Sequence, residues 1–190
     1  MTRTAIESFA CLAAIAVAAF VLPACGDASA FKLRPDAWGE TQPLVDWKGV
    51  FVELHHETNP CDAVPPECLR SFVGEHTEFE GLEVGSLKSG CAPGSEAAVE
   101  IDVRPRSIIF DFSNVENPGA FARADFNGFV INEVLQAAPA IRAVRVDREL
   151  STLDLRDEDI LVEGRKIRAN FTGLSFEDTD FVKIDLLFED

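Results

Sequence analysis

The chain has 190 residues and a formal net charge of −16, from 33 acidic and 17 basic residues. Nucleic acid and anionic membrane surfaces would both be repelled by so acidic a protein, so the composition argues against either as a partner. Roughly 160 residues would remain after loss of an N-terminal signal, enough for one domain with a true hydrophobic core.

Residues 1–24 are typical of a bacterial export signal. Their apolar run from Ala10 to Leu22 is too short for a comfortable membrane span. Leu22-Pro23-Ala24-Cys25 resembles a lipobox, which makes Cys25 the candidate for lipidation, while Ala28-Ser29-Ala30 offers an alternative cut after Ala30. We therefore expect the mature domain outside the cytoplasm, either lipid-anchored at the periplasm or cell surface or freely secreted. Membrane contact is expected only through the anchor.

Residues 25–47 lack a regular period, so we expect a flexible lead-in that packs Trp38 or Trp47 against a domain spanning 48–190. The first predicted strand is VFVELHHE, whose alternate apolar residues are Val50, Val52 and Leu54. Pro65-Pro66 then excludes a strand or helix across the next segment, although Glu67–Phe72 could form a short helical turn.

Further strands are predicted in EFEGLEVGSL, EAAVEIDV, IRAVRVD, DILVEGR, KIRANF and FVKIDLLF. FARADF-NG-FVINEV predicts a hairpin on an Asn127-Gly128 turn, with Phe126 beside Phe129. Phe171 is expected to point inward with Ile167 and Ala169, and Gly173 to turn the chain out of that strand. About nine or ten strands predict an all-β protein, an antiparallel two-sheet sandwich of jelly-roll type.

Three segments resemble a domain of extracellular proteins from proteobacteria and cyanobacteria. They are Phe126-Asn127-Gly128-Phe129-Val130, Pro139-Ala140-Ile141 and Asn170-Phe171-Thr172-Gly173-Leu174-Ser175-Phe176. In that family an FNGYV-like segment precedes a strand pair and an N-aromatic-x-G-L-x-F segment. The resemblance covers about residues 107–188 and implies a secreted β-sandwich. It implies no catalytic residue, and the sorting signals or calcium-binding repeats of some members have no counterpart here.

The cysteines fit an exported protein. Cys61, Cys68 and Cys91 remain once the signal and Cys25 are set aside, so at most one internal disulfide forms. Cys61–Cys68 would close the Pro-Pro loop and is the favoured pair, with Cys91 as an alternative partner for either. No family signature surrounds these residues, which argues against a catalytic thiol.

Two metal hypotheses arise from the sequence. His55, His56 and His76 lie near Cys61, but adjacent strand residues face opposite sides and the spacing matches no zinc pattern. Acidic turns, above all Asp157, Glu158 and Asp159, could supply calcium ligands or could simply be solvated. We expect no cofactor other than this calcium.

No nucleophile elbow, P-loop, dinucleotide-binding or zinc-protease motif is present in the sequence. The sequence thus favours an exported non-catalytic module, either structural or binding another surface protein or a glycan. The absence of tyrosine, with 15 phenylalanines present, counts mildly against a sugar-stacking face. The alternative is a jelly-roll hydrolase that acts on extracellular polysaccharide.

Overall fold

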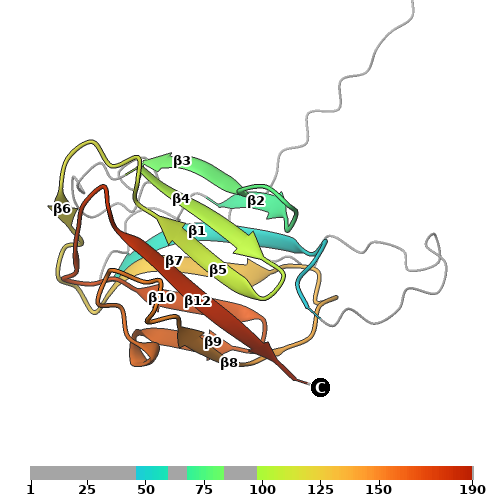
Figure 1. Cartoon of the computed structure of the whole chain (residues 1–190). Coiled ribbons are helices and arrows are strands. Elements are labelled where there is room, and N and C mark those ends of the chain that lie inside the picture. Colours follow the sequence, from blue (N-terminus) through green and yellow to red (C-terminus); the bar gives the residue numbers. More distant parts are fainter. Residues whose placement is uncertain (1–45, 60–67, 84–97, 190) are drawn as a thin grey trace, which may run out of the picture.

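The computed structural model describes residues 46–59, 68–83 and 98–189. These ranges form two five-stranded antiparallel sheets packed face to face, so the predicted all-β sandwich is confirmed (Figure 1). The signal at 1–24, the lipidation candidate Cys25 and the cysteines Cys61 and Cys91 lie outside the described residues. Within the described ranges, no helix has the length and apolar character needed to cross a bilayer.

The first sheet has the order β2-β1-β7-β10-β9. Its strands are β1 (Phe51–Asn59), β2 (Leu69–Phe72), β7 (Phe126–Glu133), β9 (Ile160–Glu163) and β10 (Lys166–Asn170). One inward row, Leu54, Ile131 and Ile167, runs across three adjacent strands in register. All three side chains are almost fully buried, as the alternation of apolar and polar residues predicts.

The second sheet has the order β3-β4-β5-β12-β8. Its strands are β3 (Phe79–Glu83), β4 (Ala98–Arg104), β5 (Ser107–Asp111), β8 (Ile141–Val146) and β12 (Phe181–Phe188). Alternate residues of β12 point into the core, and all are buried, as predicted: Val182, Ile184, Leu186 and Phe188. The facing sheets also meet at one side, where the Ile141 amide donates to the Gly164 carbonyl at 2.8 Å.

Phenylalanine rings fill the centre of the sandwich. Phe110 of the second sheet lies 5.4 Å from Phe129 of the first, measured between ring centroids, and 5.1 Å from Phe171. A short ribbon of β6 (Gly119–Ala120) and β11 (Ser175–Phe176) brings Phe176 to 5.6 Å from Phe112. Phe171 is fully buried, so its predicted inward orientation is confirmed.

The expected packing of Trp47 against the domain is observed: Trp47 is fully buried and lies 6.2 Å from Phe188 between ring centroids. Trp38 lies outside the described residues. Gly173 has the left-handed φ of +73° that glycine tolerates, and this position follows β10 as expected.

The predicted Asn127-Gly128 hairpin is wrong. Both residues lie inside β7, where Gly128 pairs with Glu57 on one side and Asn170 on the other. A Cβ on Gly128 would overlap the Ala169 carbonyl oxygen and lie 3.1 Å from Asn170 Cα. Glycine is therefore required here for close backbone approach rather than for a turn.

The possible helical turn at Glu67–Phe72 is wrong in its described part. Leu69–Phe72 is the edge strand β2, paired with β1 from Phe51↔Phe72 to Leu54↔Leu69. Leu69 packs against the core while the next residue, Arg70, points outward to Glu53, which is the side-chain alternation of a strand. The intrinsic propensities of these residues did not predict this strand.

Candidate functional site

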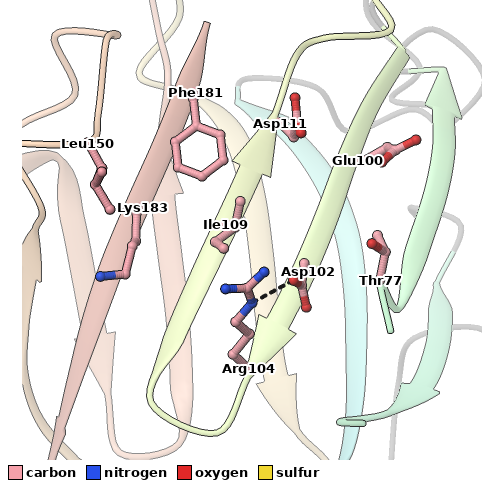
Figure 2. Close-up of a pocket in the computed structure, with 9 residues that line it drawn as sticks. All are labelled: Thr77, Glu100, Asp102, Arg104, Ile109, Asp111, Leu150, Phe181 and Lys183. Carbon is pink, nitrogen blue, oxygen red and sulfur yellow. Dashed lines mark hydrogen bonds and ion pairs between the residues drawn. The ribbon is translucent and has the colours of Figure 1, made fainter. Parts of the chain in front are cut away.

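The outer face of the second sheet carries a shallow basin of about 400 Å³. Three adjacent strands, β4, β5 and β12, supply its floor, and the segments before β3 and after β8 supply its rim. Its lining combines acidic, basic, aromatic and aliphatic side chains: Thr77, Glu100, Asp102, Arg104, Ile109, Asp111, Leu150, Phe181 and Lys183. Figure 2 shows Ile109 in the middle, with the charged groups and the Phe181 ring around it.

Strand register fixes these side chains in two rows. Glu100 is directly opposite Asp111, which is in turn opposite Phe181. In the second row, Ile109 lies between Asp102 and Lys183. Side chains directly opposite each other in antiparallel strands have Cβ atoms about 5 Å apart, so the members of each row are in reach of a common ligand.

The charges of the second row are compensated within the protein. Arg104 donates from Nε to Asp102 at 2.7 Å (Figure 2). Lys183 Nζ lies 2.9 Å from Asp147 and 3.0 Å from Asp185. These hydrogen bonds with Asp147 and Asp185 raise the pKa of Lys183, and the bond from Lys183 lowers the pKa of Asp147.

Among the residues that the structure describes, the carboxylates of the first row have only neutral donors. Asn114 donates from its side-chain amide to Glu100 at 2.5 Å, and the Ser113 amide donates to Asp111 at 2.8 Å. No lysine, arginine or histidine of the described residues lies within 4.0 Å of either carboxylate. This pair of like charges therefore faces solvent beside the Phe181 ring.

A second, more open basin of about 360 Å³ lies on the outer face of the first sheet. It is lined by Asn59, Asp125, Phe126, Glu158, Asp159, Leu161, Arg168 and Asn170. Here the guanidinium of Arg168 lies 4.5 Å from the centre of the Phe126 ring and 2.6 Å from Glu57. The aromatic ring of this basin is thus covered by the protein's own cation, which also pairs with the nearby Glu57.

The three calcium candidates sit on a 3-10 turn, Asp157–Asp159, and each has at least one carboxylate oxygen with a protein partner. Asp157 accepts from the Val146 amide at 2.7 Å, Glu158 lies 2.9 Å from Arg156, and Asp159 accepts from the Arg156 guanidinium at 3.2 Å. These contacts tie the turn to β8 and neutralise part of its charge. The calcium hypothesis therefore stays a prediction that the geometry does not favour.

The histidines separate as predicted: His56 points into the core, His55 lies on the outer face, and His76 is exposed. Glu53, His55 and Cys68 have ligand atoms within 4.8 Å of one another, the one such trio in the described ranges. However, Cys68 is joined in a disulfide and Glu53 lies 2.6 Å from Arg70, so these groups are already committed. The identity of the second cysteine, Cys61 or Cys91, stays a prediction.

His56 forms a buried polar contact that the sequence did not reveal. Its Nε2 lies 3.0 Å from the side-chain oxygen of Asn127, whose amide donates to the Ala122 carbonyl at 2.9 Å. Its Nδ1 is buried and has no hydrogen-bond partner. Burial lowers the pKa of His56 from its usual 6.5 to about 4, because the charged ring would lose its hydration.

We expect acid to destabilise the fold through His56. The unfolded chain binds a proton at this ring below pH 6.5 and the folded chain only near pH 4, so stability is full above 6.5 and is lost as pH falls toward 4. The loss amounts to about 3 kcal/mol for this one group. Urea unfolding at pH 7 and pH 4 measures it.

His56→Gln keeps a polar partner for Asn127 and cannot titrate, so most of this drop should vanish in that variant. His76→Gln removes an exposed ring and serves as the control, with the drop unchanged. An equal pH dependence in His56→Gln and wild type would contradict the assignment, since carboxylates would then account for the whole effect.

No family model, curated protein or solved structure matches this chain. The basin on the second sheet is therefore interpreted from its own geometry. Alternation of apolar and polar residues along β4 and β12 accounts for the outward orientation of Glu100, Asp102 and Lys183. It could not show that β4, β5 and β12 are neighbours, which is what brings these groups together.

Proposed function

We propose that this protein is an exported, non-catalytic β-sandwich module that binds a ligand on the outer face of its second sheet. The basin carries the proposal. Its carboxylates and its aromatic ring belong to hydrogen-bonded strands, so little ordering is needed when a ligand arrives, and less binding free energy is lost. A mixed polar and apolar lining with a few fixed charged groups is the usual composition of a ligand site.

Export is supported by the N-terminal sequence. The lipobox-like residues 22–25 precede the lead-in, and the resemblance of residues 107–188 to extracellular domains supports the same compartment. An oxidising compartment also suits a disulfide at Cys68, for which we propose Cys61 as the partner. In this picture a lipid on Cys25 holds the module at the membrane.

We expect Cys25→Ala to release the protein from the membrane fraction. The acyl chains on this sulfur would be the only strong membrane attachment, since a strongly acidic domain has little affinity for anionic lipid. Fractionation of cells and mass spectrometry of the mature N-terminus measure the effect, with thermal melting as the control for folding. A mature N-terminus at Phe31 without added acyl mass would show plain secretion instead.

The alternative, a polysaccharide hydrolase, has one observation in its favour: Glu100 and Asp111 are close enough for a carboxylate pair. A general acid and a nucleophile need contrasting environments, however. Here both groups are partly exposed and each accepts a hydrogen bond from one neutral donor. Release of reducing ends from envelope polysaccharide, abolished in Glu100→Gln, would establish the hydrolase and overturn the non-catalytic module.

A further inference from the structure

The first row of the basin differs from most outward-facing carboxylates of the two sheets. Carboxylates on the outer faces generally have a cation beside them, as in Glu53 with Arg70 at 2.6 Å and Asp185 with Lys183 at 3.0 Å. Glu100 and Asp111 instead stand directly opposite each other, an arrangement that destabilises an antiparallel pair. A local cost of this kind, in a cavity, points to a partner group that the described part of the chain does not supply.

The basin's own cations do not fill this place. Arg104 is held on Asp102, and Lys183 points away from Ile109 toward Asp147 (Figure 2). Within the described ranges, no basic side chain therefore occupies the space between the two carboxylates and the Phe181 ring.

On the first sheet, a comparable combination of an aromatic ring and a carboxylate binds an arginine side chain of the protein itself. There Arg168 lies over the Phe126 ring and reaches Glu57, so ring, carboxylate and guanidinium complete one another. The row on the second sheet offers the same ring and carboxylate chemistry with two acidic groups instead of one. An aromatic face and carboxylates together attract a cation more strongly than either does alone.

We propose that the row Glu100–Asp111–Phe181 binds a cationic side chain, that of an arginine in a basic polypeptide segment. This proposal rests on the proposed function and names the ligand of the same site. The guanidinium would lie on the Phe181 ring and donate to both carboxylates, while its methylenes cover Ile109 and Leu150. Arginine fits better than lysine because its planar, weakly hydrated group stacks on rings and donates in two directions. The net charge of −16 would draw a basic partner toward the protein.

The test uses the full mature protein and a synthetic peptide that alternates arginine and glycine, with a citrulline version as the neutral probe. Calorimetric titration at physiological salt should detect the arginine peptide and not the citrulline peptide. Glu100→Gln with Asp111→Asn should weaken binding at least about tenfold, which equals about 1.4 kcal/mol. Phe181→Leu keeps apolar volume without the ring and should weaken binding several-fold.

The matched control removes the same charge elsewhere: Glu116→Gln with Asp178→Asn, two exposed residues outside the basin. Less than about twofold loss is expected there, since only long-range attraction changes. Because like charges are removed, the basin variant should melt at or slightly above the wild-type temperature. Equal weakening in both double variants would show that peptide binding comes from general charge attraction, and would overturn the proposal.

Two further outcomes distinguish failure of the arginine assignment from failure of the proposed ligand-binding function. Displacement of the peptide by millimolar calcium, with calcium binding lost in the basin variant, would identify a metal site and overturn the arginine assignment. Binding of a neutral oligosaccharide such as chitohexaose, lost in Glu100→Gln with Asp111→Asn, would overturn the cationic ligand and leave the binding module intact. If neither peptide, calcium nor oligosaccharide binding depends on the basin, the ligand assignment and the proposed binding face both fail.

Discussion

Phe171→Ala should lower the free energy of unfolding by about 3–5 kcal/mol, the usual cost of deleting a ring from a packed core. The ring is fully buried and lies 5.1 Å from Phe110 and from Phe121, and 5.7 Å from Phe129, between ring centroids. It therefore touches both sheets and the segment after β6 at once. Phe171→Ala would leave a cavity surrounded by residues from three parts of the chain. Movement of a single loop could therefore not fill it.

Urea unfolding measures the loss, and an unchanged m value would show that stability rather than compactness has changed. Phe72→Ala is the matched control, because that ring is 63% exposed and its removal should cost less than about 1 kcal/mol. A domain of this size is stable by about 5–15 kcal/mol, so the Phe171 variant should also melt many degrees lower. Wild-type melting in Phe171→Ala would show that the ring does not join the two sheets.

The strands could be predicted because their two faces meet different surroundings. In FVKIDLLF and KIRANF, every second residue is apolar, and the structure buries those residues. A period of two survives in the sequence wherever one face of a sheet is wet and the other is packed. The same reasoning correctly placed His55 and His56 on opposite faces of β1.

The candidate site could not be predicted because it depends on which strands are neighbours. Glu100 and Phe181 are far apart in the sequence, and only the order β4-β5-β12 places Asp111 between them. Local sequence carries no record of that order, since each strand would alternate identically in another arrangement. Only the register shows that Glu100 and Asp111, two like charges, lie directly opposite each other, which is unfavourable in an antiparallel pair.

The wrong prediction of a hairpin turn at Asn127-Gly128 has a different cause. The same residue pair can form a tight turn or can serve packing inside a strand, as it does here. Asparagine followed by glycine is the strongest short hairpin signal, because both accept positive φ. Here Asn127 is buried and bonds His56, and Gly128 lets the β10 backbone approach closely. The Phe126-Asn127-Gly128 segment is thus explained by packing within the sandwich rather than by a turn.

Gly128→Ala should therefore cost at least about 3 kcal/mol, at or above the upper end of the range for overpacking. The added Cβ would overlap the Ala169 carbonyl oxygen, and this neighbour is backbone in a paired strand, so no side chain can rotate to make room. Relief requires β7 and β10 to separate, which breaks the register Ile167↔Ile131 at the centre of the first sheet.

The matched control is Gly74→Ala, where a Cβ would meet nothing closer than 3.8 Å and the backbone φ is not left-handed. That change should be neutral or slightly stabilising, because it restricts only the unfolded chain. Denaturant unfolding of both variants measures the difference, and hydrogen exchange should show lost protection at β7 and β10 amides in Gly128→Ala alone. A Gly128→Ala protein as stable as Gly74→Ala would mean that these strands are farther apart than the structure places them, and that the glycine is retained for a turn after all.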